Sequence, residues 1–215
     1  MEAITCSEMK AMDSYAINTI GIPGIVLMEN AALRVIDAID LQATNSCTIV
    51  CGTGNNGGDG LAVARHLILK SKCVDVFIAG KLDKATADFN TNLNILKNLK
   101  VPVSLIEENS GLATLEKSLQ NNDLTIDALF GIGLIRDITG LYYKVIDSIN
   151  KHSKRILSVD IPSGLDGDNG QIKGICVKAD QTVTFHRIKK GLVANKEHTG
   201  DVVVSDIGIP DIPDR

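Results

Sequence analysis

The sequence contains no tryptophan, few other aromatic residues and no long hydrophobic run. Aromatic residues make up 3% of its 215 residues, so the rings on which single-stranded nucleic acid stacks are scarce. No stretch has the length of a membrane-spanning helix, and the first residues do not form a basic segment followed by an apolar one. We therefore expect a soluble, unprocessed protein with neither a membrane nor a nucleic-acid partner.

An excess of positive charge and a cysteine framework are also missing. The chain has 22 Lys and Arg residues against 26 Asp and Glu, a net charge of −4, and this balance offers no basic block to nucleic acid. Its 5 cysteines are an odd number without a CxxC pair, which argues against disulfides and against a structural zinc site. A reducing cytoplasm is the expected location.

What the sequence does contain is an alternation of short apolar strands and amphipathic helices. This alternation predicts one α/β domain over residues 1–215, a three-layer αβα sandwich with a mostly parallel central sheet. Two extra helices are expected ahead of the sheet, at 7–20 and 25–39. Short strands within 172–204 are expected to extend the sheet at one edge. The other strands are expected at 49–51, 74–79, 101–105, 124–129, 156–159 and 182–185, and the other helices at 61–69, 85–99, 112–119 and 141–149.

A glycine run, GTGNNGGDG at 52–60, follows the first strand. Glycine lets the backbone approach a ligand closely, and the free N–H groups at the start of a helix attract anions and polar oxygens. Asn55, Asn56 and Asp59 add side-chain donors and acceptors at the same place. The run also satisfies GxGxxG, but no acidic residue ends the second strand, so an ordinary nicotinamide dehydrogenase is disfavoured.

Two further loops, 130–137 and 160–167, follow predicted strands, and in a parallel sheet such loops meet at the carboxyl edge. In the loop 130–137, Arg136 suits a phosphate oxygen, although a flexible turn with a solvated arginine also fits. Lys189 and Lys190 either add positive charge near this mouth or form a solvated hairpin edge.

Two carboxylates lie in otherwise apolar strands. Burying Asp127 and Asp160 is costly unless each meets a cation or hydrogen-bond donors. Asp127, the amide oxygen of Asn56 and the hydroxyl of Ser163 are oxygen ligands suited to a hard cation, and so few carboxylates favour a monovalent one. Alternatively, Asp127 caps a neighbouring turn.

Several motifs in order resemble the YjeF N-terminal domain family of NAD(P)H-hydrate epimerases. They are MENA at 28–31, GNNGGDG at 54–60, DALFG at 127–131 with Arg136, VDIPSG at 159–164 and DIGIP at 206–210. The resemblance implies a Rossmann-like fold, one potassium ion per subunit and a homodimer. It also implies that the chain interconverts R and S NADHX or NADPHX for nicotinamide nucleotide repair, with a separate S-specific dehydratase as functional partner.

The resemblance also implies roles for individual residues. Asp160 is expected to be the catalytic residue, with Asp59 as the second choice, because epimerisation needs a group that gives and takes a proton. Asn56, Asp127 and Ser163 are expected to bind potassium. The substrate is expected to contact Asn55, Asn56, Gly57, Gly58, Asp59, Gly131, Ile132, Gly133, Leu134, Ile135, Arg136, Asp137 and Asp160.

A non-catalytic nucleotide- or RNA-binding scaffold of the same fold is the competing interpretation. Such scaffolds can lose the site, whereas all three loops are complete here. The acidic, aromatic-poor composition also offers little to RNA, so the enzyme is favoured.

Overall fold

One parallel sheet organises the molecule, which we describe from a computed structural model covering residues 2–107 and 111–211. Its seven strands run in the order β3-β2-β1-β4-β5-β6-β7, and every neighbouring pair is parallel. The order reverses at β1, which pairs with β2 on one side and β4 on the other. The strands are β1 Ser46–Cys51, β2 Cys73–Ala79, β3 Val103–Ile106, β4 Leu124–Ala128, β5 Ile156–Val159, β6 Gln181–Phe185 and β7 Asp201–Ser205.

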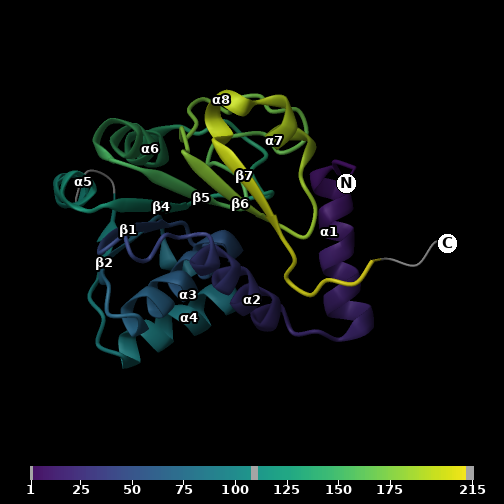
Figure 1. The fold of residues 1–215 in the computed structure, drawn as a ribbon, viewed down its shortest axis with the longest axis horizontal. Helices are drawn as coiled ribbons and strands as arrows, with labels where there is room; N and C mark the ends of the chain where they lie inside the picture. Colours follow the sequence, from purple (N-terminus) through teal and green to yellow (C-terminus); the bar gives the residue numbers. More distant parts are fainter. Residues whose placement is uncertain (1, 108–110, 212–215) are drawn as a thin grey trace.

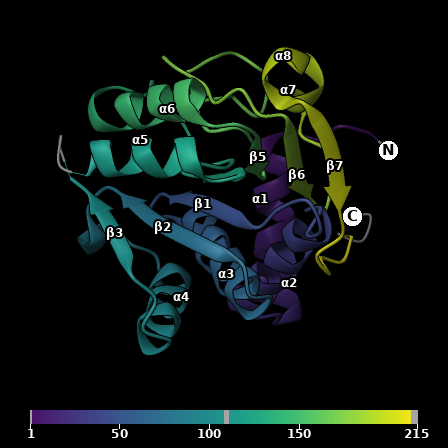
Figure 2. The same ribbon diagram turned by 60° about the vertical axis from the view of Figure 1, so that its left-hand side comes forward.

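Helices cover both faces of this sheet, so the predicted three-layer αβα sandwich is confirmed (Figures 1 and 2). One layer holds α2 (Gly24–Asp37), α3 (Asn55–Leu69) and α4 (Ala87–Asn98), and the other holds α5 (Leu112–Asn121) and α6 (Gly140–His152). The short helices α7 (Lys190–Ala194) and α8 (Lys196–Thr199) lie beside α6 in Figure 1. Among the described residues, no helix is both long and apolar enough to cross a membrane.

The first helix stands outside these layers, near the carboxyl ends of the last strands (Figure 1). It comprises α1 (Cys6–Tyr15) and a π-helical turn, η1 (Ala16–Ile20), which ends at Gly21 with φ +86°. A capping box between Thr5 and Glu8 fixes its start. The side chain of each residue accepts a hydrogen bond from the backbone N–H of the other. This helix becomes one wall of the site described below.

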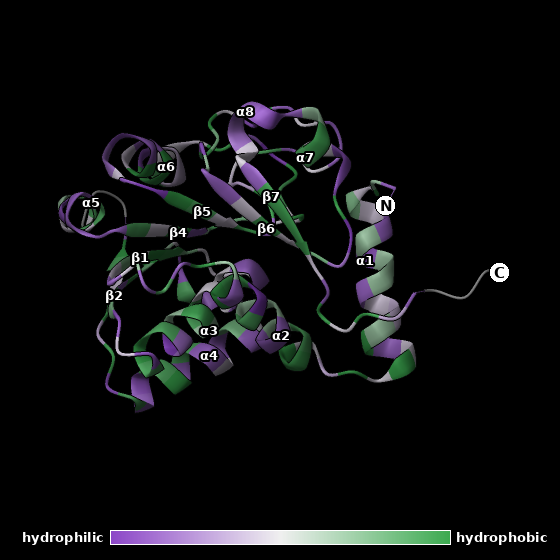
Figure 3. Ribbon diagram, in the orientation of Figure 1, coloured by the Kyte–Doolittle hydropathy of each residue, from purple (hydrophilic) through white to green (hydrophobic). Residues whose placement is uncertain are grey.

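Alternation along the strands divides the hydrophobic core between the two faces of the sheet. Ile49 and Cys51 pack with the α2–α3–α4 layer, whereas Val50 between them packs with the α5–α6 layer. This follows from the two-residue period of a strand. In Figure 3 even the edge strand β7 is hydrophobic along most of its length, whereas α8 is hydrophilic.

The connection between the last two strands differs from the prediction of strands and turns within residues 172–204. The expected turns exist, with φ +79° at Gly174 and φ +56° at Gly200. However, α7 and α8 carry the chain back across the sheet, so β7 lies parallel to β6. Parallel neighbours need such a crossover, and the prediction missed it because these two helices are too short to show a periodic pattern.

Helix α3 begins earlier than predicted, at Asn55 instead of residue 61. A Cβ on Gly57 would lie 1.8 Å from the carbonyl oxygen of Gly52, and one on Gly60 would lie 2.6 Å from the Cβ of Ala128. The glycines therefore let the first turns of α3 lie directly on the sheet. The glycine run is the start of the helix rather than a loop ahead of it.

Candidate active site

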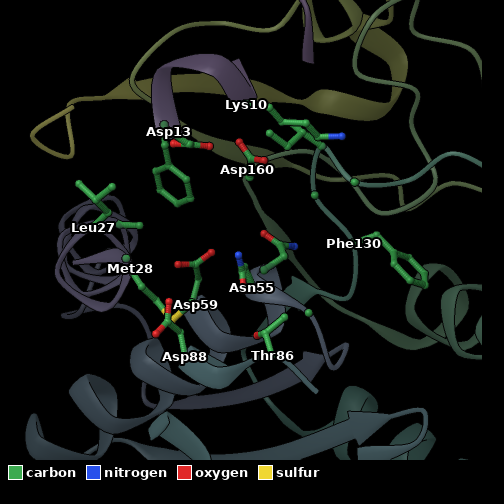
Figure 4. A pocket seen from close by; sticks show the side chains of 18 of the residues that line it. Lys10, Asp13, Leu27, Met28, Asn55, Asp59, Thr86, Asp88, Phe130 and Asp160 are labelled. Atoms are coloured by element: carbon green, nitrogen blue, oxygen red, sulfur yellow. The ribbon is translucent and has the colours of Figure 1, made fainter. Parts of the chain in front are cut away.

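A cavity of about 580 Å³ opens at the carboxyl ends of β1, β4 and β5. Strand order reverses between β1 and β4, and ligands of open α/β sheets bind at such switch points. The volume lies in the usual range for small-molecule sites. Side chains from α1, α2 and the segment before α4 close the cavity on the side away from the sheet (Figure 4).

The first turns of α3 direct three polar side chains into this cavity. Asn55, Asn56 and Asp59 all line it. Gly57 and Gly58 are buried on the other side of the helix, where a Cβ on Gly58 would lie 2.7 Å from the terminal methyl carbon of Met28. Gly57 and Gly58 therefore provide close packing, whereas Gly54 and the polar residues of the run line the cavity.

The loop after β4 forms another part of the lining. Gly131, Ile132, Gly133 and Leu134 line the cavity. The remaining predicted contacts of this loop, Ile135, Arg136 and Asp137, are exposed and lie outside the lining, with Ile135 85% exposed. The structure thus places the first half of the loop at the site and the second half at the surface.

Asp160 lies at the end of β5 and is paired with a buried lysine. Its backbone is left-handed, with φ +66°, an uncommon conformation for a non-glycine residue that tends to occur at functional positions. Its Oδ1 accepts hydrogen bonds from the Nζ of Lys189 at 2.7 Å and the Oγ1 of Thr184 at 3.3 Å. Lys189 is 1% exposed, so it is not the solvated hairpin edge that the sequence also allowed.

Asp59 is held in the opposite electrostatic environment. Burial is the main cause that raises the pKa of its carboxyl well above the ordinary value of 3.8, and Asp160, Asp13 and Asp88 raise it further. Figure 4 shows Asp13 and Asp160 facing the space into which Asp59 points. Like charges at close range disfavour ionisation, so the protonated form of Asp59 is stabilised.

Behind the cavity, Asp127 bonds Ser163, which bonds the backbone of Phe130, and Asn56 lies beside the next residue, Gly131. The Asp127 carboxylate is fully buried and accepts hydrogen bonds from Ser163 N at 2.8 Å, Ser163 Oγ at 2.6 Å, Ser158 Oγ at 2.9 Å and Leu129 N at 3.3 Å. Burial raises the pKa of this carboxyl above its ordinary 3.8, although these hydrogen bonds act in the opposite direction. Ser163 Oγ also accepts a bond from Phe130 N at 2.9 Å.

The Asn56 amide next to this cluster lacks partners. Within the described residues, its buried Oδ1 and Nδ2 make no hydrogen bond. A Cβ on Gly131 would lie 3.4 Å from that Oδ1. Buried polar atoms are nearly always bonded, so an unpaired amide facing a cavity indicates a ligand.

Sequence reasoning missed the side chains that come from outside the three loops. Asp13 falls on the buried face of α1, one turn after Met9 and one before Ala16. That spacing was the one available signal, because a carboxylate on an apolar helix face needs a reason. Other polar lining residues that the sequence did not indicate include Lys10, Lys84, Thr86, Asp88 and Tyr142.

Comparisons with known proteins agree with this architecture. Residues 24–191 match the family described as YjeF-related protein N-terminus. The chain is 40% identical to an NAD(P)H-hydrate epimerase of Anaerococcus prevotii over 98% of its own length and 96% of that protein. It is 41% identical to an NAD(P)H-hydrate epimerase of Limosilactobacillus fermentum, over 95% of this chain and 96% of that one.

Two further matches bear on fold and domain content. The chain is 41% identical to a bifunctional NAD(P)H-hydrate repair enzyme, Nnr, of Moorella thermoacetica, over 98% of this chain but 41% of that enzyme. The crystal structure of yeast ynu0, YNL200c, superposes with a TM-score of 0.80 over 99% of this chain and 90% of that one. At 23% identity, the yeast structure supports the fold alone.

Proposed function

The chain belongs to the YjeF-related protein N-terminus family, and from this membership we propose that it is an NAD(P)H-hydrate epimerase. In this activity, an isomerase interconverts the R and S epimers of NADHX or NADPHX, in which the nicotinamide ring is hydrated at C6. The names of its relatives support the assignment over most of the chain. They do not favour the nucleotide- or RNA-binding scaffold.

The observation that carries the proposal is the pair of unlike carboxyl groups at one cavity. Inverting C6 requires either the C6–N1 bond or the C6–O bond to break and re-form on the other face. Ring opening moves the hydroxyl proton to a base and places a proton on the ring nitrogen. Loss of water instead protonates the hydroxyl, and the water that returns gives a proton to a base. Either route needs one acid and one base.

Asp160 and Asp59 supply those two groups. Asp160 forms an ion pair with Lys189, whereas the pKa of Asp59 is raised well above its ordinary value. Carboxyl groups whose environments differ in this way are typical of acid–base pairs. Lys10, Lys84 and the N-terminus of α3 border the same cavity, and they provide positive charge and N–H donors for the phosphates of a dinucleotide.

A coupled assay tests the activity. Purified protein is mixed with R-enriched NADHX, potassium and an S-specific dehydratase, and the recovery of NADH absorbance is followed. Recovery faster than the spontaneous rate supports the epimerase. Recovery at the spontaneous rate, from a protein shown by circular dichroism to be folded, would instead favour the binding scaffold.

Asp160→Asn tests the residue that we place at the reacting carbon. The amide keeps the size of the side chain but neither accepts a proton nor attracts Lys189, so kcat should fall by about 100-fold or more. Asp201→Asn is the matched control, because Asp201 is an exposed carboxylate at the start of β7. Full turnover by Asp160→Asn would exclude the role.

We also propose that one potassium ion binds at Asn56, Asp127 and Ser163. Two features support the fit. The Asn56 amide lacks a partner among the described residues, and the groups that donate to the buried Asp127 carboxylate are neutral hydroxyl and backbone N–H groups. A monovalent cation would offset that buried charge and bond the amide oxygen, with hard oxygen ligands throughout. When bound, it supplies positive charge beneath the loop after β4.

Thermal melts test the potassium site without an activity readout. A ligand of the folded state raises the melting temperature in proportion to the logarithm of its concentration once the site is saturated. We expect potassium chloride to do so relative to choline chloride, and Asn56→Ala to lose the response. Asn55→Ala, which changes an exposed neighbouring amide, should keep it. An undiminished response in Asn56→Ala would contradict the site.

The remaining expectations follow from the proposed activity. The bifunctional name of the Moorella thermoacetica protein supports a functional partnership between this chain and an NAD(P)HX dehydratase. We propose that the chain works as a homodimer in the cytoplasm. Light scattering at micromolar concentration tests the dimer, and a mass of about 23.0 kDa would show a monomer instead.

A further inference from the structure

All three N–H groups of the buried Lys189 ammonium are hydrogen-bonded within the protein. The side chain is 1% exposed, and its Nζ donates to Asp160 Oδ1 at 2.7 Å, Thr184 Oγ1 at 2.9 Å and the carbonyl of Phe185 at 3.0 Å. An ammonium group has three protons, so each has an acceptor. Burying a lysine is costly unless it is paired in this way, and this pair borders the cavity.

The backbone of Lys189 is held by the amino-terminal segment. Ile4 forms a parallel bridge with Lys189, with Ile4 N bonded to the carbonyl of Ile188 and Lys190 N bonded to that of Ile4, each at 2.9 Å. Below it, Thr184 belongs to the buried strand β6. The lysine is therefore fixed from two sides before any substrate arrives.

We propose that Lys189 is a positioning residue for the reaction: it holds Asp160 as an oriented carboxylate anion, making Asp160 the base and leaving Asp59 to act as the acid. This inference rests on the proposed function. It goes beyond that function by assigning the two proton-transfer roles and by naming the residue that separates them.

The charges around the two carboxyl groups support this division. Asp160 is faced by Lys189 from the turn after β6, by Asp13 from α1 and by Asp59 from α3, and the thiol of Cys6 lies within electrostatic range. Asp59 is faced by three carboxyl groups, from α1, α4 and β5, without a bonded cation among its described partners. Asp160 is therefore bonded to a cation, whereas Asp59 faces like charges without one among its described partners.

The pKa of Asp13 responds to the same two charges, those of Asp160 and Lys189. Its pKa is raised from 3.8 to about 6, chiefly by burial and also by Asp160, while Lys189 acts in the opposite direction. A charge on Asp160 is thus felt across the cavity, and Lys189 opposes it. Without the lysine, three carboxyl groups around one space would compete for protons, and no single one would be fixed as the base.

Lys189→Met tests the inference, because methionine keeps the length of the chain and removes the charge. We expect kcat to fall roughly 100-fold with KM nearly unchanged, since Lys189 acts through Asp160. The acidic limb of the kcat profile should move to higher pH, because the positive charge bonded to the carboxylate would be gone, and a purely structural role would not produce that shift. Lys190→Met, which removes an exposed charge one residue away, should change neither.

Two further variants keep the test decisive. If Lys189→Met does not fold, Lys189→Arg retains the charge, and its acidic limb should stay at the wild-type pH even if kcat falls. In the Asp160→Asn background, Lys189→Met should cause little additional loss, because its partner is already gone. A wild-type pH profile in folded Lys189→Met, or a shifted limb in Lys189→Arg, would overturn the inference. A wild-type protein without epimerase activity would instead overturn the proposed function.

Discussion

At the scale of single residues, what the sequence predicted depended on whether a side chain was unusual in its own segment. Asp127 and Asp160 are carboxylates in or directly after apolar strands, and Asp59 lies within a run of glycines and amides, so the sequence indicated all three as candidate site residues. The sequence did not indicate Asp13 and Asp88, because they belong to helices whose position relative to the site is set by tertiary packing. Lys189 was ambiguous, since a sequence does not distinguish a buried lysine from a solvated one.

The raised pKa of Asp13 has a consequence for stability. The folded chain keeps this proton up to about pH 6, whereas an ordinary aspartate releases it near 3.8. The unfolded state therefore binds fewer protons in that window, and the free energy of unfolding falls as pH rises through it. Above about pH 6, the folded state carries the full free-energy cost of ionising this buried carboxyl.

Asp13→Asn should remove that cost. At about pH 8 we expect the free energy of unfolding to rise by about 1–3 kcal/mol, because a shift of one pKa unit corresponds to about 1.4 kcal/mol. At about pH 4 the variant and the wild type should be nearly equal. Urea unfolding at both pH values measures the difference, and an equal effect at the two would mean that Asp13 is not held protonated.

At the scale of elements, helix α3 shows how glycine serves the site. Alanine is ordinarily favoured over glycine within a helix by about 1 kcal/mol. At Gly60 the sign should reverse, because the added methyl would lie 2.6 Å from the Cβ of Ala128 and 2.8 Å from the Sγ of Cys51. Gly60→Ala should therefore destabilise the protein by about 1–3 kcal/mol, the range typical of overpacked cores.

Gly133→Ala is the control for that substitution. Nothing lies within 4 Å of a Cβ at Gly133, so its melting temperature should stay near that of the wild type. If Gly60→Ala melts at or above the wild-type temperature, α3 does not lie as close to the sheet as the structure places it.

Helix α1 lies outside the part of the chain that the family match covers, as do η1, α8 and β7. The match covers residues 24–191, yet Met9, Lys10, Asp13 and Ile17 line the cavity. The sequence predicted this helix from its periodicity and gave no indication of where it docks. Its position near the carboxyl ends of the strands (Figure 1) makes it part of the site rather than an appendage.

At the scale of the whole molecule, the alternation of strands and helices was sufficient to predict the parallel sheet and its covered faces. Long periodic segments indicated the strands and helices, and the rule that parallel strands need crossovers placed those helices on the faces of the sheet. The two short helices between β6 and β7 were missed because they carry no periodic signal. Convergence of the three loops followed from topology, whereas the charges that surround Asp160 and Asp59 required the structure.

We assign to this cavity the interconversion of the two epimers of a hydrated nicotinamide nucleotide. The most direct measurement starts from each purified epimer of NADHX separately, without a dehydratase, and follows both by chromatography. We predict that the protein brings both solutions to the same R-to-S ratio faster than the spontaneous reaction, and that Asp160→Asn does not. Spontaneous rates from both starting epimers, with the folded wild-type protein and potassium present, would contradict the account.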